Sequence, residues 1–381
     1  MRERTKAQAT LDEIAVRASI ARGRLDGAIA GFECNARVVV HFHPDRFTTD
    51  GSTVAEALLR EGRYRNQFET GISNGSLTGF AGGDRDRWEA GLFGNAYRAA
   101  AAGERPKYGA LDCLGYSDGA VPFFGSCYLV LHGGVFPRCT FTFGDSCEAE
   151  CAGVVGEMHS VAAAMMKFVE DGHSFTGDRM TIDKLIARLA RRSRSRAPAS
   201  RRLGRILEHY VEAQVHGPIE LARDVAALVA DPSYCGTSVG RVLAAMCDRH
   251  RIPLRWHAGY SLPAASVPDD FQGPLFDRVR GARMPALAQR VAQPEGVLDA
   301  AIIGRAVAAL DRRAGKLFDE AVKDLNHLWY LLVQFGVPRS VKPGRSMQRA
   351  GGAIGVSCGP STSTSAGQSC PRKVRGLACL A

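Results

Sequence analysis

Several features of common protein classes are missing from this sequence of 381 residues. No apolar run approaches the roughly 18 residues that a membrane-spanning helix needs. The first residues mix charges and show no apolar signal-peptide core. The 11 cysteines are irregularly spaced and include no CxxC pair, which argues against a disulfide scaffold and for a reducing compartment. We therefore expect a soluble, cytoplasmic protein without membrane contact, although delivery by another secretion route stays open.

The fingerprints of the common nucleotide-binding folds are also missing. No GxGxxG follows a strand pattern, and no GxxxxGK[ST] occurs. The expected strands and helices are segregated and do not alternate regularly, which argues against a barrel of eight βα units. Hydrophobic content of 45% and charged content of 23% are ordinary for a globular protein with a sizeable core. The sequence therefore predicts an α+β fold.

Apolar periodicity predicts where the elements of this fold lie. Strands are expected at residues 36–43, 126–131, 138–143, 210–217 and 254–257. Helices are expected at residues 3–30, 53–62, 156–170, 181–190, 219–230, 238–250, 297–311 and 315–335. Four parts follow: an N-terminal helical segment (1–32), an α+β domain (33–262), a C-terminal helical region (263–340) and a tail (341–381) predicted to be disordered.

The stretch from Tyr210 to Gly217 alternates apolar and polar residues, as a half-buried strand does. Successive side chains of a strand point to opposite faces. One face then carries Glu212, Gln214 and His216. A surface strand with a polar face is one interpretation. The other is an active-site strand that presents Glu212 to a cleft.

The strand at residues 36–43 ends in His41-Phe-His43-Pro-Asp-Arg46. The two histidines point the same way because they lie two residues apart on a strand. One interpretation is a metal site, since His-x-His is a familiar ligand pair. A second is a ligand-binding edge, where a histidine bonds a sugar and Arg46 meets a phosphate. A third is a surface loop with two ordinary histidines.

Two further segments are open to more than one interpretation. The segment from Glu69 to Ser76 is dense in glycine and small polar residues, so it forms either a backbone nest for an anion or a plain hydrophilic loop. The segment Arg188–Arg205 holds eight arginines and no acid, within a chain of net charge +10. It is either a flexible, solvated insertion or a weak tether to a polyanion. No aromatic residue interleaves these arginines, so base stacking has no support there.

Seven short segments resemble an uncharacterised domain family of bacteria and fungi, known only as a domain of unknown function. They are HFHPDR, QFETGISNGSLT, GGDRDRWE, RPKYGALD, TFTFGDS, EAQVHG and LNHLWYLLVQFG. The resemblance covers roughly residues 10–336 and is specific in its motifs. That family implies no activity.

Parts of the same set resemble, more distantly, the ADP-ribosyltransferase superfamily, whose members include toxin-like effectors. In that superfamily a first strand ends in His or Arg, a second segment carries a Ser/Thr or Tyr motif, and a late strand carries the catalytic Glu. The corresponding pieces here are His41 or His43, the segment from Glu69 to Ser76, and Glu212-Ala-Gln214. The resemblance implies a split antiparallel or mixed sheet core of ADP-ribosyltransferase type, with helical additions at both ends.

The resemblance also implies NAD as substrate, for ADP-ribosyl transfer or for NAD glycohydrolysis. Breaking the nicotinamide–ribose bond develops positive charge on the ribose, as glycoside cleavage does. Glu212 would stabilise that charge, and Gln214 and His216 would position Glu212 or the acceptor. Gln214 stands where a second acid would help to select an arginine acceptor. The acceptor is therefore unknown, with a protein among the candidates.

The remaining roles implied by the resemblance concern NAD binding. His41 or His43 would orient the adenosine-side ribose or the nicotinamide amide. Arg46 or Arg105 would take the pyrophosphate. The nicotinamide pocket would be formed by the segment after Glu69 and a tyrosine packed nearby, namely by Ser73, Asn74, Ser76 and Tyr108.

Two other functions stay open at this point. A metal-dependent hydrolase could be built on His41 and His43, with further ligands from His132, His159, His173 or His257, although none of these has diagnostic spacing. A non-enzymatic polyanion-binding protein could use Arg188–Arg205. The three functions need different site geometries, which the fold must supply.

Overall fold

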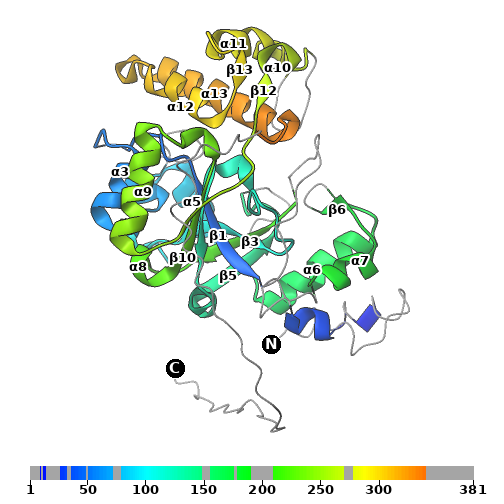
Figure 1. Cartoon of the computed structure of the whole chain (residues 1–381). Helices are drawn as coiled ribbons and strands as arrows, with labels where there is room; N and C mark the ends of the chain where they lie inside the picture. The colour runs from blue at the N-terminus through cyan, green and yellow to red at the C-terminus, as the bar shows by residue number, and fades with distance from the viewer. Residues whose placement is uncertain are drawn as a thin grey trace, which may run out of the picture. The chain divides into compact units, whose positions relative to one another are not determined.

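The structure is a computed structural model of the chain, shown in Figure 1. It divides into a compact unit, Met1–Ser340, and a separate segment, Val341–Ala381. The described residues are 9, 12–13, 26–31, 36–48, 50–71, 79–147, 155–175, 178–189, 209–269 and 278–339. Most of the expected N-terminal helix, residues 190–205 of the arginine-rich segment and the whole expected tail lie outside them.

A seven-stranded mixed sheet forms the centre of the compact unit. The strand order is β11-β10-β4-β1-β3-β8-β5, and every neighbouring pair is antiparallel except β10 and β11. The strands are β1 (Arg37–Phe42), β3 (Lys107–Asp112), β4 (Cys127–Leu131), β5 (Cys139–Phe143), β8 (Val211–Val215), β10 (Val225–Ala230) and β11 (Leu254–Trp256). The expected α+β class is thereby confirmed. The sheet is continuous, whereas a split sheet was expected.

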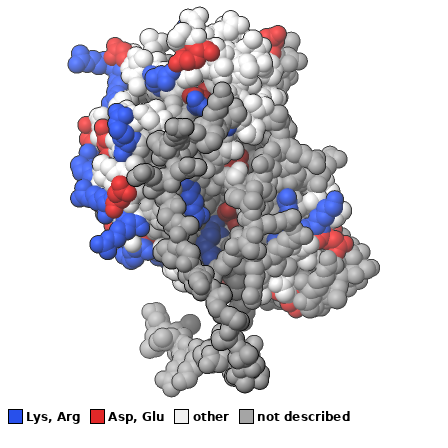
Figure 2. All heavy atoms as spheres, viewed as in Figure 1, with Lys and Arg blue, Asp and Glu red and all other residues white. Residues whose placement is uncertain are grey.

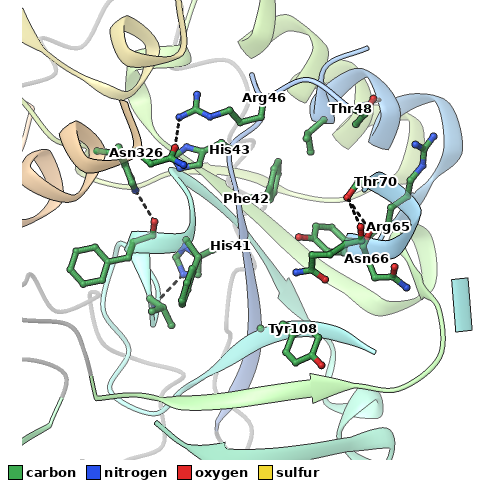
Figure 3. A pocket seen from close by; sticks show the side chains of 18 of the residues that line it. His41, Phe42, His43, Arg46, Thr48, Arg65, Asn66, Thr70, Tyr108 and Asn326 are labelled. Atoms are coloured by element: carbon green, nitrogen blue, oxygen red, sulfur yellow. Dashed lines mark hydrogen bonds between the residues drawn. The ribbon is translucent and has the colours of Figure 1, made fainter. Parts of the chain in front are cut away.

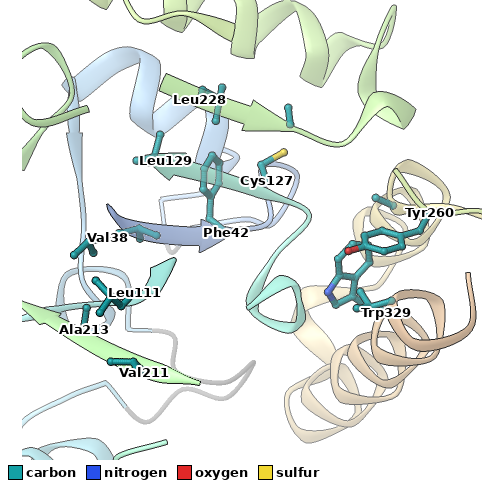
Figure 4. Close-up of a cluster of buried hydrophobic side chains, with 14 of the residues drawn as sticks. Val38, Phe42, Leu111, Cys127, Leu129, Val211, Ala213, Leu228, Tyr260 and Trp329 are labelled. Atoms are coloured by element: carbon teal, nitrogen blue, oxygen red, sulfur yellow. The ribbon is translucent and has the colours of Figure 1, made fainter. Parts of the chain in front are cut away.

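One face of this sheet packs into the main apolar core. Alternate residues of β1, β4 and β8 point to it, as the strand period of two requires. Figure 4 shows Val38 and Phe42 of β1 beside Leu129 of β4, with Val211 and Ala213 on the far strand β8. All five belong to one buried cluster, which includes residues from the surrounding helices. This face therefore stabilises the fold.

The other face of the sheet buries fewer apolar residues and carries polar side chains. Its apolar residues form a second, minor cluster that includes Val39, Ala110 and Tyr128. Glu212 and Gln214 of β8 are also buried on this face, at 5% and 0% exposure. Buried polar side chains must find hydrogen-bond partners or a ligand. This face is consequently the one on which a site can form.

Helices surround the sheet on several sides. They are α3 (Val54–Glu61), α4 (Gln67–Thr70), α5 (Asp84–Leu92), α6 (Met158–Glu170), α7 (Ile182–Leu189), α8 (Leu221–Asp224), α9 (Ser238–His250), α10 (Arg278–Gly281), α11 (Met284–Val291), α12 (Ala300–Ala308) and α13 (Lys316–Phe335). Three two-stranded sheets pair β2 (Arg63–Tyr64) with β9 (Ile219–Glu220), β6 (Ser174–Phe175) with β7 (Asp178–Arg179), and β12 (Leu262–Pro263) with β13 (Val297–Leu298). No helix among the described residues is long and apolar enough to cross a membrane.

The C-terminal helices α10 to α13 lie together beyond one end of the sheet (Figure 1). Trp329 of α13 is 1% exposed and donates its indole N–H to the carbonyls of Pro122, at 2.9 Å, and Phe123, at 3.1 Å. Gly304 of α12 packs so closely that a Cβ there would lie 1.6 Å from Oδ2 of Asp45. These contacts fix the helical region against the loops that end β1 and precede β4.

The structure corrects two expectations about elements. Residues 219–230 were expected to form one helix, but they form β9, the single turn α8 and strand β10. A short apolar run such as Val-Ala-Ala-Leu-Val-Ala does not distinguish a buried strand from a helix by periodicity. Strand β3 was not expected, because Gly109 and the charged Asp112 weaken its pattern. It nevertheless lies between β1 and β8.

Candidate active site

A cavity of about 380 Å³ opens on the polar face of the sheet. Its walls come from β1, β3, β8, the α3–α4 segment, α5, the turn after β5, and helices α12 and α13. Figure 3 shows His41, His43 and Arg46 following one another along one wall, with Tyr108 across the space from them. Ligand pockets in proteins have volumes of about 300 to 1,000 Å³, so the cavity can hold a small molecule.

Sheet register brings the early histidine strand and the late acidic strand to this one cavity. Val39 of β1 is paired with Ala110 of β3, and Ala110 is paired with Glu212 of β8. Adjacent strands lie about 4.8 Å apart, so β8 runs about 10 Å from β1 at this level. His41 lies two residues beyond Val39 on the same face. Both Glu212 and His41 line the cavity.

Glu212 is the central acid of the site. Its Oε1 accepts hydrogen bonds from the Ser146 hydroxyl at 2.5 Å and from the Gln214 amide at 2.8 Å. Burial, followed by the nearby negative charge of Asp145, raises the pKa of Glu212 to about 7, although the hydrogen bonds oppose this shift. No Arg or Lys of the described residues forms an ion pair with Glu212 or Asp145. The charges of Glu212 and Asp145 together favour a positively charged ligand.

A chain of hydrogen bonds leads from Glu212 to Tyr97. The Thr140 hydroxyl donates to Oε1 of Gln214 at 2.9 Å, so its oxygen must accept from Nε2 of His216, also at 2.9 Å. A neutral His216 protonated on Nε2 then accepts at Nδ1 from the Tyr97 hydroxyl. Burial and the charge of Arg138 lower the pKa of His216, which favours this neutral form. Each hydrogen bond in this series is therefore donated in the direction of the Glu212 carboxylate.

A second chain of hydrogen bonds determines which proton His43 carries. The Tyr234 hydroxyl donates to Asp45 at 2.8 Å, so it accepts from Ser126 at 3.1 Å. Ser126 then accepts from Nδ1 of His43 across a longer contact of 3.4 Å. Burial, followed by the charges of Arg46 and His41, lowers the pKa of His43 well below its usual range. Its Nε2 is therefore left as a neutral acceptor, with no hydrogen-bond partner among the described residues.

His41 is held by the loop that precedes β4. Its Nε2 accepts from the backbone N–H of Val121 at 3.3 Å, and its Nδ1 donates to the carbonyl of Gly125 at 3.1 Å. A Cβ on Gly119 would lie 2.5 Å from Nε2 of His41, so only glycine allows the loop to approach so closely. Both ring nitrogens are consequently used by the backbone. The ring supports the cavity wall and is not available to bond a ligand.

An aromatic and cationic wall lies near Glu212. The Arg85 guanidinium carbon is 4.7 Å from the ring centroid of Trp88 and 4.6 Å from that of Tyr108. All three side chains line the cavity. Trp88 also donates to the carbonyl of Ser146 at 2.7 Å, which links α5 to the turn that holds Glu212. Arg85 and Trp88 lie in the motif GGDRDRWE, and Asp145 and Ser146 lie in TFTFGDS. None of them was assigned a role in the site from the sequence, because none has a diagnostic spacing.

Five of the predicted site residues line the cavity, and others do not. The five are His41, His43, Arg46, Tyr108 and Glu212. Gln214 is buried and donates to Glu212, while His216 lines a separate cavity. Ser73, Asn74 and Ser76 lie outside the described residues.

Glu69 and Arg105 make structural contacts away from the cavity. Glu69 closes the capping box of α4 and pairs with Arg63. Arg105 pairs with Asp86 at 2.6 Å, and its guanidinium lies 3.9 Å from the ring centroid of Phe68. It is 6% exposed. Of the two arginines expected to take the pyrophosphate, only Arg46 reaches the cavity.

The alternatives of a metal site and a polyanion site can be compared with this geometry. Within the described residues, no three or more His, Cys, Asp or Glu side chains come together as metal ligands would. The predicted polyanion segment lies almost entirely outside the described residues. Figure 2 shows basic side chains along the side formed by α3, α8 and α9, with acidic side chains among them. That mixture does not make a surface of one sign.

The fold and the cavity define an α+β protein with a ligand-sized pocket around one buried carboxylate. A family model described as "Protein of unknown function (DUF3626)" matches residues 37–335. The chain belongs to this family, which confirms the expected membership of an uncharacterised domain family. The match includes all the described residues that line the cavity. No curated protein matches the chain.

Proposed function

We propose that this protein cleaves the nicotinamide–ribose bond of NAD, and transfers the ADP-ribosyl group to an acceptor or to water. The observation that carries the proposal is the position of Glu212, buried in the same cavity as His43 and Arg46. The strands that bear His41, Tyr108 and Glu212 are neighbours in the sheet, in the order β1-β3-β8. Two of the three pieces of the resemblance to the ADP-ribosyltransferase superfamily, the strand of His41 and the strand of Glu212, therefore line one cavity, and this supports the proposal.

Cleavage of the nicotinamide–ribose bond is accelerated by a negative charge beside the developing sugar cation. As the bond to nicotinamide breaks, positive charge builds on the ribose, and a fixed carboxylate nearby lowers the barrier. Ser146 and Gln214 hold Glu212 in one orientation, so little reorganisation is needed at the moment of reaction. The second acid, Asp145, adds to the negative potential. Glu212 acts in its ionised form.

Other cavity residues would bind NAD. The free Nε2 of His43 can accept a hydrogen bond from a ribose hydroxyl. Arg46 can bind the pyrophosphate, since a guanidinium matches phosphate oxygens in charge and geometry. The rings of Tyr108 and Trp88, which line the same cavity, can contact the nicotinamide ring. His41 contributes indirectly by fixing the loop at Val121.

The proposal is tested by incubating the purified full chain with NAD and measuring free nicotinamide. Glu212→Gln keeps the shape of the side chain and removes its charge, so we expect the rate to fall by about 100-fold or more. Asp248→Asn, which neutralises an exposed acid on α9, serves as the matched control and should leave the rate unchanged. Full activity in Glu212→Gln, or no NAD cleavage by the wild type, would overturn the proposal.

A further inference from the structure

The cavity continues past Arg46 into a compartment formed by the C-terminal helices. Its walls there are mostly apolar and come from the loop after β1, from α12 and from α13, namely Phe47, Val307, Phe318 and Val322. One carboxylate, Asp319 in the first turn of α13, lines the same space. No Lys or Arg of the described residues forms an ion pair with Asp319. An apolar pocket with one acceptor suits a nucleoside.

The polar groups of the cavity follow one another in a fixed order along β1. Glu212 is level with Val39, and His43 comes after the strand end at Phe42. With a rise of about 3.3 Å per residue, positions 39 to 43 span about 13 Å. Arg46 lies further on, where its guanidinium donates to Asn326 of α13 at 3.3 Å (Figure 3). The order is thus carboxylate, imidazole, guanidinium and apolar compartment.

Close packing against the sheet domain holds this compartment in place. Gly304 of α12 lies against Asp45, and Trp329 of α13 donates to the loop at Pro122. The Arg312 guanidinium lies 3.6 Å from the ring centroid of Phe47, which fixes the aromatic wall. The compartment is therefore present before any ligand binds. Such pre-organisation reduces the entropy cost of binding.

We propose that the compartment under α13 binds the adenosine half of NAD, with Arg46 at the pyrophosphate and Asp319 at the adenosine ribose. This inference rests on the proposed function, because it assumes that the nicotinamide half lies at Glu212. The ribose hydroxyls donate to the carboxylate of Asp319, as acidic residues accept ribose hydroxyls in dinucleotide sites. A phosphate on that ribose meets a negative charge, so NADP is a poor substrate.

The experiment compares NAD with nicotinamide mononucleotide, which lacks the adenosine half. Val322→Phe fills the compartment, and Phe318→Ala enlarges it. Each should raise KM for NAD by about tenfold, the equivalent of losing one good apolar contact, and leave kcat/KM for the mononucleotide unchanged. Leu317→Ala, on the same helix but 76% exposed and outside the cavity, is the matched control.

A second measurement separates this inference from the proposed function. Calorimetry with ADP-ribose, which needs no bond cleavage, should show binding to the wild type and about tenfold weaker binding to Val322→Phe. If the wild type binds ADP-ribose in this way but does not cleave NAD, only the proposed catalysis fails. If both variants change the kinetic constants for NAD and for the mononucleotide equally, or change neither, the proposed adenosine site is wrong.

Discussion

At the scale of single residues, the site depends on the charge of one buried carboxylate. The pKa of Glu212 lies at about 7, because burial and Asp145 disfavour its ionised form. The ionised fraction therefore rises as the pH increases through this value. The amide of Gln214 opposes that shift by donating to Oε1. The hydrogen bonds behind Gln214 consequently influence how much active carboxylate is present at neutral pH.

Thr140→Val tests the hydrogen-bond chain from Tyr97 to Glu212. The valine keeps the volume of the side chain but removes the hydroxyl that joins Gln214 to His216. The amide of Gln214 is then held less firmly and donates a weaker hydrogen bond to Glu212, so the pKa of Glu212 rises. We expect kcat for NAD cleavage at pH 7 to fall by about tenfold, because the hydrogen bond from Gln214 to the charged carboxylate becomes weaker. KM should change little, because Thr140 does not line the cavity.

The pH profile distinguishes this positioning role from general damage to the fold. In Thr140→Val the midpoint of the rise in kcat should move to higher pH than in the wild type. Thr140→Ser retains the hydroxyl and should restore both the rate and the midpoint. The charged and titratable groups around the carboxylate are Asp145, Tyr108 and Tyr210, and none of them is altered by either variant. An unchanged midpoint in Thr140→Val would show that the chain has no such role.

At the scale of secondary structure, the strands that bear the candidate residues were predictable and their neighbours were not. Strand β1 was expected from its Val-Val-Val run, and β8 from its alternation. Strand β3 was missed although it joins them. Gly109 is needed there because a Cβ would lie 2.5 Å from the carbonyl of Val39. That need comes from a residue distant in sequence, and local periodicity does not contain it.

The roles of turn residues were likewise not predictable from the local sequence. Residues of a Gly-Asp-Ser turn, such as the one after β5, usually cap the next helix. Instead Ser146 donates to Glu212, and α6 begins only at Met158. The burial of Glu212 also exceeds the expectation for a half-exposed strand, since all five residues of β8 are buried. These contacts depend on which strands become neighbours, and the packing of the whole core determines that.

Helix α13 is joined to the sheet domain through Trp329, whose indole N–H bonds the carbonyls of Pro122 and Phe123. Trp329→Phe removes this donor and leaves a small void, so we expect the free energy of unfolding to fall by about 2 kcal/mol. Denaturant unfolding measures the change. Trp256→Phe, in the edge strand β11 and only half-buried, should cost less. Equal losses in the two variants would contradict an anchoring role for Trp329.

At the scale of the whole molecule, buried acids set the response of stability to pH. Burial raises the pKa of Glu212, Asp45, Glu89 and Asp231. Hydrogen bonds lower the pKa of other acids, including Asp50. An acid with a raised pKa holds its proton more tightly in the folded state, so the stability that it contributes declines as the pH rises. An acid with a lowered pKa has the opposite effect, and total stability reflects both groups.

Glu212→Gln isolates one of these contributions. Between its ordinary pKa of 4.5 and its folded value of about 7, Glu212 makes the wild type progressively less stable as the pH rises. The shift corresponds to about 3 kcal/mol. The difference in unfolding free energy between variant and wild type should therefore grow by about that amount from pH 4 to pH 8, in favour of the glutamine. Urea unfolding across this range measures it. A difference that stays constant with pH would mean that the fold does not raise the pKa of Glu212. Ionising this carboxylate would then not reduce the stability of the folded protein.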